Sequence, residues 1–166
     1  MEVKFEDYSS EVIGAINSAV ESWLYEAGEL IKGAAADNSR VAEGELRGSW
    51  DYKVDLGNQE TKIGSPLENA VWEEFGTGEF ATKGNGRKGY WVFVKGGSGG
   101  SSGTGGSGKS YTLAEAKRAM AILREKGLEA YYTKGKHPNP ALQTAVDTNI
   151  SKLKDRLKSI LEGVLS

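Results

Sequence analysis

Apolar side chains recur every three or four residues near both ends of the chain, the spacing that places them on one face of an α-helix. The first stretch predicts a long amphipathic helix over residues 6–32. Its apolar positions are Ile13, Ile16, Val20, Trp23, Leu24, Ala27, Leu30 and Ile31. The second stretch predicts a helix from about Pro140 to the end of the chain. Its apolar positions are Leu142, Val146, Ile150, Leu153, Leu157, Ile160, Leu161 and Val164. We expect core packing for most of these side chains and a subunit contact for part of the second stripe.

Between these helices the pattern changes to strict alternation, which indicates strands with one buried face. The alternation is clearest over residues 50–56, where aromatic and aliphatic side chains take every second position. A turn at Gly57-Asn58 and a second strand over residues 60–64 complete a predicted hairpin. Residues 90–94 are aromatic and β-branched, which favours a central strand.

Two further helices are predicted. Ser65 can cap the first, Pro66 suits its first turn and Glu68 completes a capping box, while Gly76 and Gly78 end it. The second covers residues 113–126 and is followed by Gly127 and a short strand over 128–133. The predicted fold class is therefore α+β, with long N-terminal and C-terminal helices packed on a small, mainly antiparallel sheet.

We predict one domain over residues 1–166, with residues 109–134 forming an inserted strand–helix–strand segment. Residues 96–108, ahead of the insertion, contain only glycine, serine and one threonine. This composition predicts a flexible loop with a typical end-to-end span of about 20 Å. It also resembles laboratory linkers, so the loop could be natural or engineered.

The Gly/Ser loop ends in a match to the phosphate-binding P-loop pattern, from Gly103 to Ser110. A true P-loop follows an apolar strand directly, whereas eight residues separate Val94 from Gly103. It also needs an acidic residue at the end of a second strand to hold Mg²⁺. The strand predicted after the motif ends in Lys134. We favour a chance match and keep a small nucleotide-binding protein as an alternative.

Composition removes several kinds of site. The chain has no cysteine, so disulfides, thiolate metal sites and cysteine nucleophiles are excluded. The single histidine, His137, precedes a proline and cannot form a multi-histidine metal site alone. We expect no catalytic residue, no metal and no cofactor. No apolar run approaches the roughly 20 residues of a membrane-spanning helix, and residues 1–7 lack the features of a signal peptide.

Charge is distributed unevenly along the chain. The formal net charge is -2, yet residues 1–108 carry 10 Lys and Arg against 17 Asp and Glu, a net of -7. Residues 109–166 carry 11 against 6, a net of +5. Such polarity can guide head-to-tail contacts between subunits, although two solvated faces are the simpler explanation.

A basic loop lies beside the aromatic strand. Lys83, Arg87 and Lys88 precede Tyr90 and Trp91. Cations next to aromatic rings can contact nucleic-acid phosphates and bases. A solvated hairpin tip is the simpler interpretation, and we keep sequence-nonspecific DNA binding, or a subunit contact, as alternatives for these three cations.

Two adjacent acids, Glu73 and Glu74, stand at the end of the short helix. Neighbouring helix positions point in different directions, which suits joint acid–base catalysis poorly. A helix C-terminus also carries partial negative charge. We therefore expect at least one of the two to have a cationic partner, either Arg87 or a basic residue of a neighbouring subunit.

Residues 70–78, Ala-Val-Trp-Glu-Glu-Phe-Gly-Thr-Gly, resemble the signature of a bacteriophage neck and tail-component family whose members carry a Glu-Phe-Gly-Thr segment. The Gly-Glu-Leu-Arg-Gly-Ser segment at residues 44–49 and the proline-containing start of the last helix also fit this family in type and order. The resemblance extends over roughly residues 5–95 and 136–164 and leaves residues 111–133 as an insertion relative to shorter members.

The resemblance implies a structural, non-enzymatic virion protein of the neck or tail, assembled in the host cytoplasm. Members are expected to form rings, with six subunits as the expected number, around the DNA passage between head and tail. The implied partners are other copies of the chain, a head-closure or connector protein and a tail terminator or tail-tube protein. DNA would pass through without sequence-specific contact, and no membrane is involved.

The candidate site residues are those of the signature: Glu74, Phe75, Gly76, Thr77 and Gly78. The glycines permit the positive φ of a sharp reversal. Phe75 is expected to anchor the turn in the core, and Thr77 to hydrogen-bond carbonyls freed at the helix end. This turn is the place where we expect subunit contacts.

Overall fold

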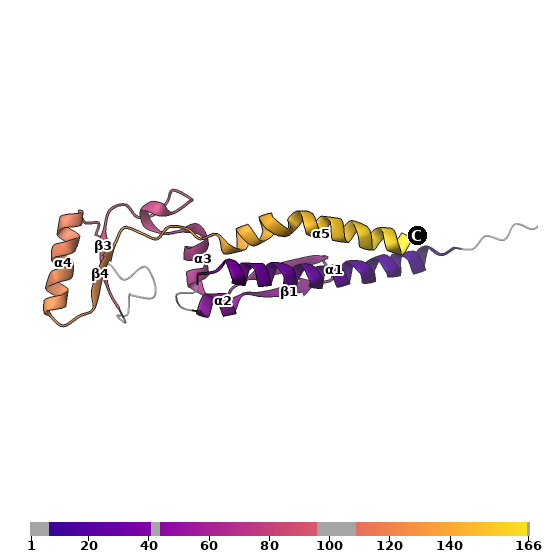
Figure 1. The fold of residues 1–166 in the computed structure, drawn as a ribbon, viewed down its shortest axis with the longest axis horizontal. Coiled ribbons are helices and arrows are strands. Elements are labelled where there is room, and N and C mark those ends of the chain that lie inside the picture. Colours follow the sequence, from indigo (N-terminus) through magenta and orange to yellow (C-terminus); the bar gives the residue numbers. More distant parts are fainter. Residues whose placement is uncertain (1–6, 41–43, 96–108, 166) are drawn as a thin grey trace, which may run out of the picture. The chain divides into compact units, whose positions relative to one another are not determined.

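The structure is a computed structural model that describes residues 7–40, 44–95 and 109–165. The predicted α+β class is confirmed (Figure 1). In chain order the elements are α1 (Ser9–Asn38), α2 (Glu45–Ser49), β1 (Asp51–Asp55), β2 (Glu60–Gly64), α3 (Glu68–Phe75), the 3-10 helix η1 (Gly78–Phe80), β3 (Trp91–Val94), α4 (Leu113–Glu125), β4 (Ala130–Thr133) and α5 (Ala141–Leu165). The chain forms two compact units. Unit 1 comprises Met1–Ala70 and Pro140–Ser166, and unit 2 comprises Val71–Asn139.

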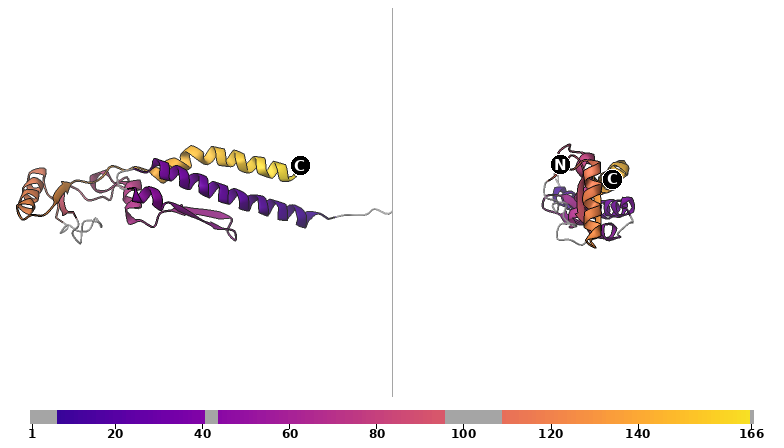
Figure 2. Two further views of the ribbon diagram at one scale, coloured as in Figure 1. Left: turned by 60° about the horizontal axis from the view of Figure 1, so that its bottom comes forward. Right: turned by 90° about the vertical axis from the view of Figure 1, so that its left-hand side faces the viewer.

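Unit 1 is built in layers around α1. The antiparallel α5 lies along one side of α1, and the β1–β2 hairpin lies along another (Figure 2). Strands β1 and β2 pair antiparallel with Asp51 opposite Gly64 and Asp55 opposite Glu60. A helix with neighbours on two sides needs apolar side chains over more than one stripe, which explains why α1 is apolar at so many positions.

Small side chains dominate the core of unit 1. Ala35 and Ala145 are fully buried, and Ala141 is nearly so. Alanine lets helices approach closely because it carries only a methyl group. Larger apolar side chains then close the core around these contacts. They are Ile31, Leu46, Trp50 and Leu153, with Trp23, Leu30, Ile63, Leu67, Leu142 and Val146 partly buried against them.

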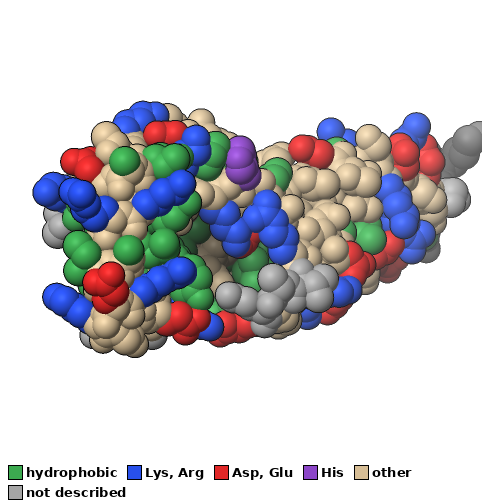
Figure 3. Space-filling model, turned by 60° about the vertical axis from the view of Figure 1, so that its left-hand side comes forward, with side chains coloured by type: hydrophobic (Ala, Val, Ile, Leu, Met, Phe, Trp, Pro, Cys, Tyr) green, Lys and Arg blue, Asp and Glu red, His purple; other side chains and the backbone are tan. Residues whose placement is uncertain are grey.

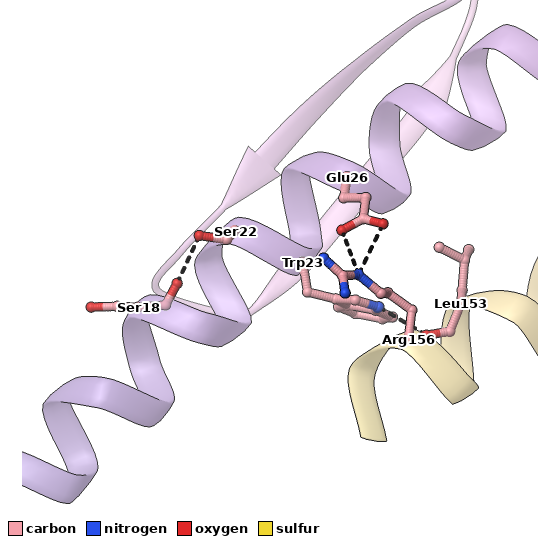
Figure 4. A network of polar contacts seen from close by, with 6 residues as sticks. All are labelled: Ser18, Ser22, Trp23, Glu26, Leu153 and Arg156. Atoms are coloured by element: carbon pink, nitrogen blue, oxygen red, sulfur yellow. Dashed lines mark hydrogen bonds and ion pairs between the residues drawn. The ribbon is translucent and has the colours of Figure 1, made fainter. Parts of the chain in front are cut away.

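Polar contacts fix the register between α1 and α5 (Figure 4). The indole N–H of Trp23 donates to the carbonyl of Leu153 over 2.9 Å. One turn further along each helix, the Arg156 Nε donates to both carboxylate oxygens of Glu26, at 3.1 and 3.2 Å. Each pair joins residues 130 positions apart in the sequence. These contacts fix the position of α5 along the axis of α1. Contacts between alanine methyl groups alone would define that position only weakly.

The last turns of α1 extend beyond the predicted end. The predicted helix ends at residue 32, whereas α1 continues through Gly33 and three alanines to Asn38. The helix ends at the buried Ser39. The Ser39 hydroxyl donates to the Ala35 carbonyl at 2.7 Å and accepts from the Trp50 indole at 2.8 Å. Burial of this segment outweighs the low helix propensity of one glycine.

Unit 2 contains a second small sheet with one helix. Strands β3 and β4 pair antiparallel, with Trp91 opposite Thr133 and Val94 opposite Ala130. Ala130 and the α4 residue Ala116 are both fully buried, and the Arg124 Nε donates to the Ala130 carbonyl at 2.9 Å. Helix α4 therefore packs on the sheet through small side chains.

Several sequence predictions need correction. The single sheet is wrong, because the described strands form two separate two-stranded sheets. Strand β3 was predicted to be central, but it pairs only with β4 within its sheet. The turn between β1 and β2 occupies residues 56–59, and the non-glycine positive φ lies at Gln59. Periodicity locates strands, but it does not name their partners, and two short pairs satisfy the same pattern as one larger sheet.

The expected strand–helix–strand insertion is present in part. Tyr111 forms a single antiparallel bridge with Tyr90 instead of a strand, while α4 and β4 follow as predicted. The Gly/Ser segment 96–108 lies outside the described residues. Among the helices that the structure describes, none is long and apolar enough to cross a membrane.

The close packing of α1 on β1 can be tested at Gly28. A Cβ added there would lie 2.7 Å from the Cγ and Cε2 atoms of Tyr52. We expect Gly28→Ala to lower the free energy of unfolding by about 1–3 kcal/mol, because the ring or the helix must move. Urea denaturation of the full chain measures this loss.

Gly33→Ala is the matched control, since Gly33 lies on the same helix with nothing within 4 Å of an added Cβ. It should raise the free energy of unfolding by up to about 1 kcal/mol through helix propensity. Equal effects of the two variants would contradict the close contact.

Candidate functional site

The signature residues lie at the end of α3, where the chain reverses into η1. Gly76 and Gly78 have φ values of +69° and +60°, as predicted. The Thr82 amide donates to the Phe75 carbonyl at 2.9 Å, and the Phe80 amide donates to the Thr77 carbonyl at 3.2 Å. The helix therefore ends in a compact turn whose backbone groups are hydrogen-bonded within the turn.

A second segment, far away in the sequence, pairs with this turn. The Thr77 amide donates to the Lys136 carbonyl and the Glu79 amide to the Lys134 carbonyl, both at 2.9 Å. In return, the Lys136 amide donates to the Thr77 hydroxyl at 3.0 Å. Further along, the Asn139 amide donates to the Glu73 carbonyl at 2.6 Å. Residues 73–80 and 133–139 thus run antiparallel where the chain enters and leaves unit 2.

Glycines allow the two segments to touch. A Cβ on Gly76 would lie 2.8 Å from the Phe80 carbonyl oxygen and 2.9 Å from that of Lys136. One on Gly78 would overlap the Lys134 carbonyl and lie 2.7 Å from the Trp91 ring. Gly135 has φ +128°, and its added Cβ would overlap the Thr77 carbonyl. We call residues 76–80 and 134–138 the glycine junction.

The basic loop closes over the junction. A Cβ on Gly86 would overlap the Gly78 carbonyl, so this loop packs on the turn through another glycine. The Glu79 carboxylate accepts from the Gly89 amide at 3.1 Å and pairs with Lys134 at 3.4 Å. The Gly89 amide first, and then Lys134, lower the pKa of Glu79 below its usual range. The loop is therefore anchored and is not the free hairpin tip that the sequence suggested.

Two of the three predicted loop cations lie against aromatic rings. The Lys83 ammonium sits 4.6 Å from the centre of the Phe75 ring. The Arg87 guanidinium lies 5.1 Å from the Trp91 ring and also donates to the Lys109 carbonyl. The Lys88 carbonyl accepts from the Ser110 hydroxyl at 2.5 Å. Each of the two cation–π contacts, from Lys83 and from Arg87, stabilises the folded chain by about 0.5–2 kcal/mol.

The acidic pair has a cationic partner, as predicted, but a different one. Glu73 forms an ion pair with Lys136 across the two antiparallel segments. Arg87, the partner proposed from the sequence, stacks on Trp91 instead. Lys136 is 63 residues from Glu73 in the sequence, so local spacing could not identify it.

Phe75 and Thr77 differ from expectation. Phe75 is 40% exposed and covers no core, so the predicted anchoring role is wrong. The hydroxyl of Thr77 accepts from the Lys136 amide and so serves the partner segment, while helix-end carbonyls are satisfied by Thr82. Glu74 is half-buried at the end of α3.

Three members of the junction could not be recognised from the sequence. They are Lys134, Gly135 and Lys136, whose functional signal is only a glycine between two lysines. His137, between β4 and α5, stacks on Phe80 with ring centres 3.7 Å apart. The Phe80 ring also faces the Lys134 ammonium at 5.2 Å. An aromatic and basic cluster therefore surrounds the turn.

The P-loop match lacks the geometry of a phosphate site in its described part. The Lys109 ammonium lies 5.5 Å from the Tyr111 ring, and Ser110 bonds to Lys88. The start of α4 is closed by a capping box, in which the Glu115 carboxylate accepts from the Thr112 amide at 2.8 Å. An acid thus occupies the helix terminus that a phosphate would need. Residues 103–108 of the motif lie outside the described residues.

Metal chemistry has no visible site in the parts of the chain that are described. No group of three or more His, Asp or Glu side chains there could hold a metal ion. What the arrangement offers is a rigid, glycine-packed turn with basic and aromatic side chains around it, which suits contact with another macromolecule.

Comparison with known proteins identifies the N-terminal part of the chain. Residues 3–76 match a family model described as "Bacteriophage HK97-gp10, putative tail-component". Over these residues the chain is similar to this bacteriophage tail-component family. The match covers α1 to α3 and stops at Gly76, so Thr77 and Gly78 lie beyond it. No curated protein and no solved structure matches the chain.

The glycine junction can be tested at Gly78. Gly78→Ala adds both a disfavoured left-handed residue and a clash with the Lys134 carbonyl. We expect a loss of about 2–4 kcal/mol in the free energy of unfolding, from roughly 1–2 of conformational strain and a similar overpacking cost. Gly84→Ala separates the two effects, because Gly84 has φ +69° with nothing within 4 Å of an added Cβ. A loss at Gly78 no larger than at Gly84 would rule out tight packing.

The contact between Glu79 and the loop should depend on pH. Because the pKa of Glu79 is lowered, its carboxylate stays ionised down to a more acidic pH than an ordinary glutamate would. It therefore also keeps its hydrogen bond from the Gly89 amide down to that pH. The contact is therefore lost as the pH falls through this lowered pKa. In an acid titration followed by NMR, the chemical shift of the Gly89 amide should change with a midpoint at the lowered pKa of Glu79. Glu79→Gln should abolish the titration, whereas Glu125→Gln on α4 should leave it unchanged.

Proposed function

We propose that this chain is a structural subunit of the phage neck or tail, which forms a ring that joins or completes the tail around the DNA passage. The observation that carries the proposal is the match of residues 3–76 to the tail-component family. Tail components are virion proteins, and the proposed refinement is the position at the head–tail interface. Both units together would form one subunit over residues 1–166, with residues 109–134 as the insertion.

Exposed apolar side chains on unit 1 support assembly with other subunits. Tyr8 and Ile13, at the start of α1, are 56% and 58% exposed, and Val12 between them is also exposed. On α5, Ile150 and Leu165 are exposed as well. Several large apolar side chains on two packed helices are typical of a surface that another subunit covers.

The partners that we propose are neighbouring copies, with six subunits in the ring, a head-closure or connector protein on one side and a tail terminator or tail-tube protein on the other. A ring requires two different contact surfaces on each subunit, since head-to-tail closure is heterologous. DNA would pass through the ring without sequence-specific contact.

A structural role also fits the polar groups best. Glu73, one of the two adjacent acids, is ion-paired to Lys136, and Lys83 and Arg87 of the basic loop lie on aromatic rings. The nucleotide-binding alternative loses support, because Glu115 closes the helix start after the P-loop match. The DNA-binding alternative loses support, because most of the loop's cations already serve the fold.

Assembly can be tested with one exposed residue of α1. We expect Ile13→Asp to fold normally, because the side chain is 58% exposed, and to lose ring formation with neck and tail partners. Complementation of a phage that lacks this gene should then give heads and tails that remain unjoined, visible by negative-stain microscopy. Ser10→Asp adds the same charge to an exposed position of the same helix and should complement fully. Normal virions with Ile13→Asp would contradict a contact at this end of α1.

A further inference from the structure

The charge asymmetry of the chain follows its two units. Unit 1 carries 10 Lys and Arg against 17 Asp and Glu, a net of -7. Unit 2 carries 11 against 6, a net of +5. Opposite charge on two compact units of one chain lets unit 2 of one copy attract unit 1 of another. Each unit has a surface that combines unpaired charge with exposed apolar area.

On unit 2 that surface is the outer face of α4. Ala116, Ala119, Met120 and Leu123 face the sheet or are partly buried. On the outer side, Lys117, Arg118, Ala121, Ile122 and the single acid Glu125 are exposed, and Ile122 is 47% exposed.

Most other cations of unit 2 have acidic or aromatic neighbours. Lys117, Arg118 and Lys126 form no ion pair with any residue that the structure describes. Lys and Arg side chains project around hydrophobic patches at the end of unit 2 that carries α4 (Figure 3).

On unit 1 the matching surface is a groove of about 330 Å³ between α1 and the β1–β2 turn. Val20, Leu24 and Leu56 give it apolar walls, and Leu56 is 48% exposed. Glu21 is the one charged side chain that lines it, and Glu21 forms no ion pair among the described residues. Asn17, Gly57, Asn58 and Gln59 complete the lining.

We propose that the outer face of α4 in one copy docks into this groove in the next copy, with Ile122 against Leu56 and with Lys117 and Arg118 near Glu21. Ile122 lies one helical turn from Arg118 on one side and one turn from Lys126 on the other. An exposed aliphatic side chain flanked by cations, opposite an apolar groove with a carboxylate at its rim, is the pattern of a helix-in-groove contact. The contact joins different surfaces of two copies, so it is heterologous and can close into a ring.

The occupant of the groove is a second copy of this chain. The charges that complement each other belong to the same sequence, and the basic face carries an aliphatic side chain at its centre. A nucleic acid would use the cations but would leave Ile122 and Leu56 uncovered. The inference rests on the proposed ring and names the contact within it.

Charge reversal on each side of the contact tests the inference. One variant carries Lys117→Glu and Arg118→Glu, and the other carries Glu21→Lys. Sedimentation velocity of the full chain at low salt should show self-association of the unaltered protein. Each variant alone should associate at least about tenfold more weakly, because like charges then meet at the contact. Raising the salt to about 0.5 M should weaken the unaltered contact as well.

Mixing the two variants gives the sharper result. Every α4 in the mixture then finds a groove of opposite charge on the other variant, so association should return to near the unaltered level. The single variants exclude isologous contacts: one between two α4 faces would be unaffected by Glu21→Lys alone, and one between two grooves would be unaffected by the α4 variant alone. Docking of α4 within its own chain would leave the mass of a single chain throughout.

Matched controls change the same number of charges elsewhere. Lys152→Glu with Lys154→Glu reverses two exposed cations of α5, and Glu11→Lys reverses an exposed acid of α1 outside the groove. All four variants should keep the circular dichroism spectrum of the unaltered chain. Controls should associate normally.

Three results would overturn the inference: a chain that stays monomeric at low salt, reversal variants that associate like the controls, or a mixture that stays dissociated. Retention on DNA lost only with the Lys117 and Arg118 variant, without self-association, would assign this face to nucleic acid instead. Failed self-association together with restored virions in complementation would reject this contact and leave the proposed function standing. Normal self-association without complementation would support this contact and reject the proposed function.

Discussion

Unit 2 depends on the contact between two stretches of backbone that meet without side chains between them. At the glycine junction the Thr77 and Glu79 amides reach the carbonyls of Lys136 and Lys134, and Gly78 and Gly135 leave the space that this approach requires. The start and the end of the unit are thereby held together, so the sheet, α4 and the basic loop between them become one closed segment. Closing a long loop at its base limits the conformations available to everything inside it.

Unit 1 uses the same device, close approach through small residues, between helices and strands. Gly28 faces the Tyr52 ring, and buried alanines separate α1 from α5. Small side chains alone do not fix the register between α1 and α5. Two directional contacts do: the Trp23 indole donates to the Leu153 carbonyl, and Arg156 pairs with Glu26. Several large apolar side chains of this unit, among them Tyr8 and Ile13, face outward, where neighbouring subunits of the proposed ring would cover them.

Local features of the fold could be predicted because they depend on neighbours in the sequence. Strand β2 has the predicted bounds, α4 begins at Leu113 as expected, and the positive φ of Gly76 and Gly78 follows from the turn they form. The contacts that create the site could not be predicted. Lys136 reaches Glu73 across more than sixty positions, and no periodicity records such a pair. Phe75 is predicted to anchor the turn in the core, whereas its ring is 40% exposed and lies against the Lys83 ammonium.

The alanine-rich core of unit 1 has a consequence for how the subunit persists before assembly. Apolar burial stabilises by about 25 cal/mol for each Å² removed from water, and a methyl group removes little. Among the described residues, no large side chain is less than 2% exposed. In the proposed ring, neighbours that bind the folded form would add to the stability of this core by mass action. The subunit's melting temperature should therefore rise with its own concentration, and subunits left without partners would be the ones that proteases remove.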